Sequence, residues 1–237
     1  MDARYDEGTP LNADEKRAHV TLLIQAGADT TGTALGCTLR FLLTHPDVLQ
    51  KARAEIEAAE EAGNLSRPVV RYDESRNHLP YFGACIKEAL RLHPPATNLF
   101  ARVVPEGGKR FSSSGSGSGG AELFVPAGME ITSNAYVVQR DPALWGPDPE
   151  AYRPERWLED DTHGASASEL EAGMFMFGTG PRVCLGKDIA MLELSKLLPE
   201  IIRNFDLKLL DVGHYVVAGG VAFNQDLRVV LTKRPGR

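Results

Sequence analysis

The pattern of apolar and polar positions in the first part of the chain predicts a long helix. Its apolar run covers residues 20–43 and ends before a His-Pro pair at 45–46. Asn12 followed three residues later by Glu15 matches a capping box at the start of this helix. The run is long enough to suggest a membrane span.

Polar residues inside this run argue against the membrane interpretation. Gln25, Asp29 and Arg40 lie within it, together with several threonines. Each of these side chains is costly in lipid, so we favour a helix of a globular domain.

Two further helices are predicted before residue 100. Pro46 at the first helical position and Gly63 as a C-terminal cap residue bound the second, which we interpret as a solvated amphipathic helix. The third runs from about Leu79 to Leu92 and is stopped by the two prolines at 94–95.

The pattern changes to short β-type segments between Leu99 and Ile131. Glycine and proline separate these segments, which is typical of hairpins. Residues 112–120 among them read SSSGSGSGG, the composition of a flexible linker, and we interpret them as a mobile insertion without chemistry.

The second half of the chain mixes irregular and regular segments. Four prolines within residues 141–157 exclude a long helix or a central strand, and the acidic residues 159–173 are expected to form a loose surface loop. A helix is then predicted to about Asn204, followed by strands with turns. The predicted fold is therefore mainly α with small β-sheets, an α+β class.

The charge balance narrows the class of partner. Among 237 residues, 26 are Lys or Arg and 32 are Asp or Glu, so the net charge is -6. This argues against nucleic acid or an anionic membrane surface as the main partner, because both reward clustered Lys and Arg. The N-terminus is polar and has no apolar segment of the kind a signal peptide or anchor needs, so we expect the chain as it stands to be soluble.

One of three cysteines stands in an unusual place. Cys37, Cys85 and Cys184 are far apart and odd in number, which indicates neither a disulfide framework nor a Cys-x-x-Cys metal site. Cys184 lies in FMFGTGPRVCLGKDIA, residues 175–190, among glycines and directly before an apolar-periodic helix. Free N–H groups and the dipole at a helix N-terminus favour the thiolate form.

Two phosphate-binding interpretations of this glycine loop fail on spacing. Five residues separate Gly180 from the Gly186-Lys187 pair where a P-loop has four, and Asp188 stands where Ser or Thr is needed. Val183 occupies the third-glycine position of a dinucleotide fingerprint.

A thiolate can attack an electrophile or ligate a soft metal. Attack needs a histidine base, and none of the six histidines shows itself as that partner, so ligation is favoured over a thiol hydrolase. A small buried cysteine is the plainest alternative, but it explains neither the glycines nor Arg182.

The segment FGTGPRVCLG, residues 177–186, resembles the haem-binding loop of the cytochrome P450 family of haem-thiolate monooxygenases. The resemblance implies that Cys184 is the axial thiolate ligand of the iron of haem b (iron protoporphyrin IX), whose electron donation favours O–O cleavage. It further implies that Arg182 donates to a haem propionate and that the ring of Phe177 packs beside the thiolate. Gly180 and Gly186 complete the motif.

A second resemblance lies in KEALRLHPP. Glu88 and Arg91 share a helix face at i, i+3 spacing, which alone would indicate only a weak surface ion pair. In the family, Glu-x-x-Arg is a buried structural pair whose network is completed by the arginine of a Pro-Glu-Arg segment, here Arg156 in PERW. The implied role is to hold the fold that presents the cysteine loop.

A third resemblance is AGADTTG, residues 26–32, within the first predicted helix. Thr30 can bond back to the carbonyl four residues earlier, and glycines 27 and 32 weaken the helix, so a local distortion is expected. Alone, Asp29 would be interpreted as a solvent-facing residue. The resemblance implies that Asp29 and Thr30 are the acid–alcohol pair that relays protons to the oxygen substrate. Arg102, on the strand after the third helix, resembles a further propionate partner.

The resemblance implies which part of the family fold this chain represents. Residues 1–237 resemble the C-terminal region, from the oxygen-binding helix onward, so the N-terminal half and its membrane anchor are expected to be missing. PERWLEDD and the helix after the cysteine loop are similar to fungal microsomal members. For a full-length protein, this implies the endoplasmic reticulum membrane.

The implied activity is insertion of one oxygen atom from O2 into an organic substrate. Electrons would come from an NADPH-dependent flavoprotein reductase, whose acidic surface Lys187 and Lys196 would steer. A truncated haem-binding fragment without catalytic activity is the alternative interpretation, and the sequence leaves both open.

Overall fold

The computed structural model describes residue 5 and residues 7–97, 100–112, 122–158 and 167–235. The predicted insertion at 112–120 lies outside these residues except for Ser112. The chain divides into a larger unit, Met1–Thr97 with Ala135–Arg237, and a smaller unit, Asn98–Asn134. Each unit is described by itself.

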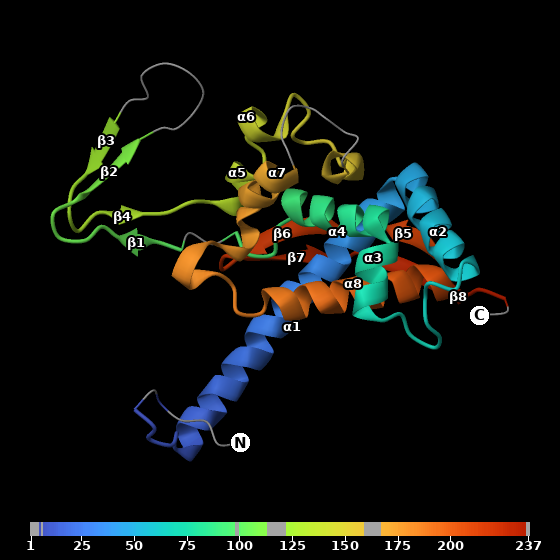
Figure 1. Cartoon of the computed structure of the whole chain (residues 1–237), viewed down its shortest axis with the longest axis horizontal. Coiled ribbons are helices and arrows are strands. Elements are labelled where there is room, and N and C mark those ends of the chain that lie inside the picture. The colour runs from blue at the N-terminus through green and yellow to red at the C-terminus, as the bar shows by residue number, and fades with distance from the viewer. Residues whose placement is uncertain (1–4, 6, 98–99, 113–121, 159–166, 236–237) are drawn as a thin grey trace. The chain divides into compact units, whose positions relative to one another are not determined.

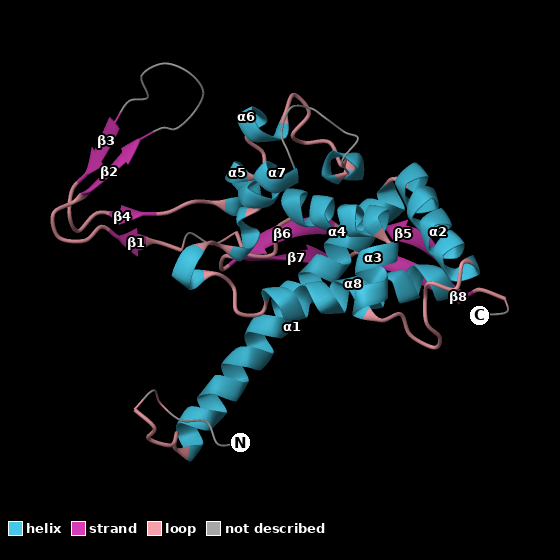
Figure 2. Cartoon of the chain, in the orientation of Figure 1, coloured by secondary structure: helices cyan, strands magenta, loops and turns pink. Residues whose placement is uncertain are grey.

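Helices dominate the larger unit (Figure 1), and short antiparallel strands accompany them (Figure 2). Its helical segments, with η for 3₁₀ turns, are α1 Ala13–Thr44, α2 Pro46–Glu61, α3 Tyr72–His78, α4 Pro80–Leu92, α5 Ala135–Val138, α6 Pro142–Trp145, η1 Pro154–Trp157, α7 Ala167–Gly173, η2 Phe175–Phe177, η3 Gly180–Arg182 and α8 Lys187–Asn204. Its strands are β5 Phe205–Asp211, paired with β8 Arg228–Lys233, and β6 His214–Ala218, paired with β7 Val221–Gln225. The predicted class, mainly α with small sheets, is confirmed.

The smaller unit consists of two antiparallel strand pairs, as the glycine and proline spacing predicts. β1 Arg102–Val103 pairs with β4 Glu130–Ile131, and β2 Lys109–Ser112 pairs with β3 Glu122–Val125. Because β2 and β3 lie between β1 and β4 in sequence, the pair β2–β3 continues the hairpin that β1–β4 begins.

The long first helix forms as predicted. The side chain of Asn12 accepts hydrogen bonds from the backbone N–H groups of Asp14 and Glu15, and the Glu15 carboxylate accepts one from the N–H of Asn12, so the capping box is confirmed. α1 continues as one helix through residues 27–32, and the expected distortion does not interrupt it.

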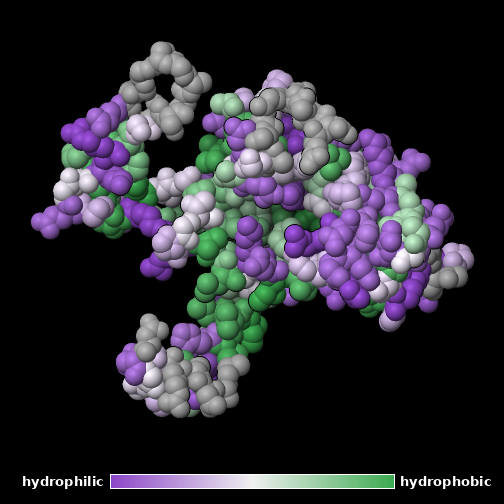
Figure 3. Space-filling view, in the orientation of Figure 1, coloured by the Kyte–Doolittle hydropathy of each residue, from purple (hydrophilic) through white to green (hydrophobic). Residues whose placement is uncertain are grey.

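Only the second half of α1 packs into the core. Its buried residues begin at Thr31, whereas Leu22, Leu23 and Ile24 in the first half are 61%, 69% and 66% exposed. Figure 3 shows this first half as a mainly apolar stretch of helix. No helix within the described ranges is long and apolar enough to cross a membrane.

The core forms where α1, α2, α4 and α8 meet. Leu42, Ile56, Phe82, Leu194 and Leu198 are each at most 1% exposed and belong to one apolar cluster. Burial of such a side chain contributes about 1.5–3 kcal/mol. This cluster fixes α8, and with it the loop before α8, against the second half of α1.

The structure corrects the expected loose loop over residues 159–173. Among its described residues, 167–173 form α7, and Leu170 packs into a second apolar cluster with Trp145 and Trp157. The acidic, small-residue composition of this segment did not indicate the burial of Leu170, which packs α7 against the rest of the unit.

Candidate functional site

The cysteine loop is a tight turn directly before α8. Gly178 and Gly180 have φ angles of 69° and 65°, in the left-handed region that favours glycine. The N–H of Cys184 donates to the carbonyl of Phe177 at 2.8 Å and closes the loop. Gly186 is the N-cap of α8, so Cys184 lies just outside the helix N-terminus, as predicted.

Cys184 is exposed, whereas Cys37 and Cys85 are buried. Its apolar neighbours Val183, Leu185 and Ile189 are also exposed, at 42%, 97% and 63%. Exposed apolar side chains this close together in sequence are typical of a binding surface.

The chemistry of this loop fits haem. An exposed thiol suits the iron, an exposed apolar surface suits the porphyrin ring, and the exposed cation of Arg182 suits a carboxylate. The Lys187 ammonium also lies 5.8 Å from the ring centroid of Phe177, within cation–π range.

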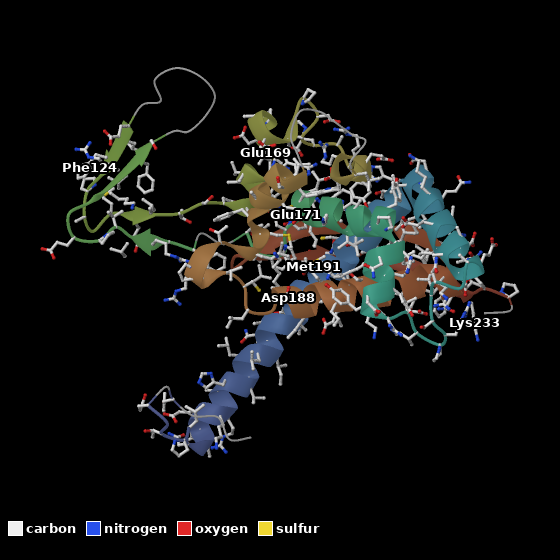
Figure 4. All side chains as sticks on the ribbon, in the orientation of Figure 1. Phe124, Glu169, Glu171, Asp188, Met191 and Lys233 are labelled. Carbon is white, nitrogen blue, oxygen red and sulfur yellow. The ribbon has the colours of Figure 1, made fainter. Side chains whose placement is uncertain are left out.

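α1 carries the predicted acid–alcohol pair and also packs against α8. The two helices pack against each other, and Figure 4 marks Asp188 and Met191 at the end of α8 that passes α1. Asp29 is exposed and Thr30 is partly buried. The Thr30 hydroxyl donates to the carbonyl of Ala26 at 2.7 Å, the back-bond that the spacing predicts.

An open groove of about 670 Å³ borders Asp29. One wall is α1, at Ala28, Asp29 and Gly32, and the other is the β6–β7 hairpin, including Val221 and Phe223. The groove gives an organic molecule access to the acid–alcohol segment of α1.

The structure brings Glu88, Arg91 and Arg156 together in a buried network. The Glu88 carboxylate accepts two hydrogen bonds from Arg91, at 2.9 and 2.8 Å, and one from Nε of Arg156 at 2.8 Å. The side chains are 0%, 0% and 4% exposed. Charge-assisted bonds of this kind are the strong ones, because no water competes for them.

Sequence reasoning missed two members of this network. Nε1 of Trp157 donates to Glu88 at 2.9 Å, and its place within PERW was the available signal. Gln139 is fully buried, donates to the carbonyl of Arg91 at 2.8 Å and accepts from the N–H of Met176 at 2.8 Å. Gln139 thus connects the end of α4 to the segment that leads into the cysteine loop.

The network is nearly balanced in charge. Asp148 Oδ1 lies 3.4 Å from Nη2 of Arg156 and supplies a second carboxylate. Burial by itself would raise the pKa of Asp148, but the positive charges of Arg156 and Arg153 outweigh it and hold that pKa below its usual range.

The remaining predicted residues are Arg102 and the two lysines of α8. Arg102 belongs to the smaller unit, is exposed and donates to the carbonyls of Phe100 and Ala101. Lys187 and Lys196 are nine positions apart on α8, about two and a half turns, so they lie on opposite faces.

Comparison of the sequence with known proteins points to the same family as the motifs do. The sequence model of the family described as Cytochrome P450 matches residues 1–215. The chain is 38% identical over 216 residues to the cytochrome P450 monooxygenase esdpH of Penicillium shearii, covering 91% of this chain and 41% of that protein. It is 37% identical over 203 residues to pisatin demethylase of Fusarium vanettenii, covering 86% of this chain and 36% of that protein.

A third relative shows a similar identity and also matches over only part of its length. The cytochrome P450 monooxygenase mpaDE of Penicillium brevicompactum is 37% identical over 213 residues, covering 90% of this chain and 24% of that protein. The chain thus spans well under half the length of these curated relatives. The family match and these identities show that the chain belongs to the cytochrome P450 family.

Proposed function

We propose that this chain is the haem-ligating, C-terminal part of a monooxygenase that inserts one oxygen atom from O2 into an organic substrate. The observation that carries the proposal is the exposed thiol of Cys184 within an exposed apolar surface, in a member of the cytochrome P450 family. The cofactor would be haem b, which when bound supplies the iron chemistry that activates dioxygen.

Residues of the loop would hold the cofactor. The Cys184 thiolate would ligate the iron, and the N–H of Cys184, bonded to Phe177, keeps the thiol outside the helix end. Val183 and Leu185 offer apolar surface to the ring, and Arg182 offers a cation to a propionate.

Asp29 and Thr30 would move protons from water toward the oxygen substrate. Asp29 is exposed to solvent at the edge of the groove, so it can exchange protons with water. Thr30 holds its hydroxyl proton on the carbonyl of Ala26, so donation toward the groove requires that the hydroxyl turn away from this bond.

Electrons would come from an NADPH-dependent flavoprotein reductase. Because the two proposed steering lysines lie on opposite faces of α8, a single docking surface can use only one of them. Lys187 is the better candidate, since it is exposed and adjoins the cysteine loop.

The test is a carbon monoxide difference spectrum of the haem-loaded, reduced chain. We expect the red-shifted Soret band of thiolate ligation, and we expect its loss in Cys184→Ser. Cys85→Ala is the matched control, because it removes a buried cysteine of α4 and should keep the band.

A band that survives Cys184→Ser would contradict the ligand assignment. If the haem-loaded chain shows the thiolate band, we expect it to oxidise apolar organic compounds when reductase and NADPH are supplied. If it binds haem but oxidises none of a broad panel, the alternative holds, that of a haem-binding fragment without catalytic activity.

A further inference from the structure

The two walls of the groove beside Asp29 are joined by polar side chains that the sequence motifs leave without a role. The Thr33 hydroxyl on α1 donates to the carbonyl of Ala222 on β7 at 2.7 Å. From β7, Nδ2 of Asn224 donates to the carbonyl of Thr33 at 3.2 Å and to Sγ of Cys37 at 3.2 Å. We call Thr33, Cys37, Ala222 and Asn224 the α1–β7 lock.

Spacing along α1 allows this contact. Thr33 and Cys37 are four residues apart, so they lie on the same face of the helix, one turn from each other. The Asn224 side chain spans this turn, and the thiol of Cys37 reaches back to its Oδ1 at 3.6 Å. The nitrogen and the oxygen of the Asn224 side-chain amide therefore both bond to residues of α1.

Gly36 provides the space that the lock needs. A Cβ at position 36 would lie 2.7 Å from Nδ2 of Asn224, closer than real Cβ atoms approach. Gly36 is helical, so its requirement is space and not an unusual backbone angle. A side chain here would push Asn224 off the helix.

The β6–β7 hairpin is also held on its other side. The N–H of Ala222 donates to the carbonyl of Pro95 at 2.8 Å, and the Tyr215 hydroxyl donates to the carbonyl of Pro94 at 2.7 Å. These bonds do not involve α1. Loss of the lock should therefore release the hairpin from α1 while the hairpin stays attached to residues 94–95.

We propose that Asn224 and Thr33 are positioning residues that fix β7 against α1 and so set the width of the groove beside Asp29. The consequence for catalysis rests on the proposed function. The lock itself is a property of the folded chain, so it can be tested without haem.

The test is alkylation of the whole folded chain with iodoacetamide at neutral pH, with each cysteine quantified by mass spectrometry. Cys37 is a fully buried member of the lock, and this burial raises its pKa to about 11, so its thiol should react only when the hairpin opens. Cys85, buried under other elements, reports general unfolding.

Asn224→Ala and Thr33→Val should each speed alkylation of Cys37 on the order of tenfold, the effect of losing one or two buried hydrogen bonds, without a change at Cys85. Thr33→Ser keeps the hydroxyl and should restore protection. Asn204→Ala is the matched control, since Asn204 is an equally half-buried asparagine whose two bonds go to Glu200 on α8.

Two results would overturn the lock. One is an unchanged rate at Cys37 in both Asn224→Ala and Thr33→Val. The other is an equal acceleration at Cys37 and Cys85, which would mean that the variants merely weaken the whole fold. Neither result depends on haem binding, so failure of the lock and failure of the proposed monooxygenase function are separable.

Discussion

At the scale of single residues, Glu88 does more than its motif indicates. Its two oxygens accept five hydrogen bonds, from Arg91, Arg156, Trp157 and the N–H of Arg153. The i, i+3 spacing predicts that Glu88 and Arg91 can pair, but it does not predict burial. Arg156 lies 68 residues further along the chain, and only the resemblance to the family suggested it. Local pattern cannot predict such a pair.

Replacement of Glu88 should be severely destabilising. Glu88→Gln leaves two buried guanidinium groups without their main counter-charge, and we expect a loss of about 3–5 kcal/mol in the free energy of unfolding. Urea denaturation measures this. Glu171→Gln is the control, because its pair with Lys87 is exposed, and its loss should be about 0–1 kcal/mol. Similar losses in the two variants would contradict the network's role.

At the scale of elements, a helix could be predicted from the sequence when its apolar pattern extends over several turns. α1, α4 and α8 have sustained apolar periodicity, and each was expected close to its observed range. α3 and α7, with seven residues each, were not expected. In α3 only Ser75 is buried, so there is no apolar face to detect. Its start depends on Glu74, which binds Ser66 eight residues earlier.

The start of α3 should therefore respond to acid. The hydrogen bond from the Ser66 hydroxyl, followed by those from the N–H groups of Arg71 and Ser66, lowers the pKa of Glu74 from 4.5 to about 2. A lowered carboxyl pKa contributes stability that is complete above about pH 4.5 and is lost as pH falls toward 2.

Hydrogen exchange of the α3 amides across this pH window measures the effect. We expect their protection to fall with pH in the wild type and to vary less in Glu74→Gln. Asp73→Asn is the neighbouring control, because the Asp73 side chain pairs with Arg71 at the surface and its replacement leaves the bond between Glu74 and Ser66 in place. If the protection of the α3 amides depends on pH equally in Glu74→Gln and in the wild type, Glu74 is not the cause of that pH dependence.

At the scale of the whole larger unit, an aromatic cluster joins segments that are far apart in sequence. Phe41 of α1 stacks on Tyr152 with ring centroids 4.6 Å apart, and His93 after α4 stacks on Tyr215 of β6 at 4.0 Å. Phe41 and His93 lie 4.7 Å apart and link the two pairs. Like the α1–β7 lock, these contacts depend on tertiary packing, so neither was visible in the sequence pattern.

His93 should make this cluster sensitive to acid. Burial, reinforced by the charges of Arg40 and Arg140, lowers the pKa of His93 from 6.5 to about 3, so the folded chain keeps the ring neutral. The unfolded chain takes up a proton on this ring below about pH 6.5. The folded state therefore loses stability relative to the unfolded state as pH falls from 6.5 toward 3.

His93→Phe preserves a ring for stacking on Tyr215 and removes the titrating group. Near pH 7 its free energy of unfolding should be close to that of the wild type, and at pH 5 it should be higher by about 2 kcal/mol. Urea denaturation at both pH values measures this difference. His78→Phe, at an exposed position of α3, should show no such gain. A gain at pH 5 in both variants, or in neither, would mean that the acid sensitivity of the fold arises outside this cluster.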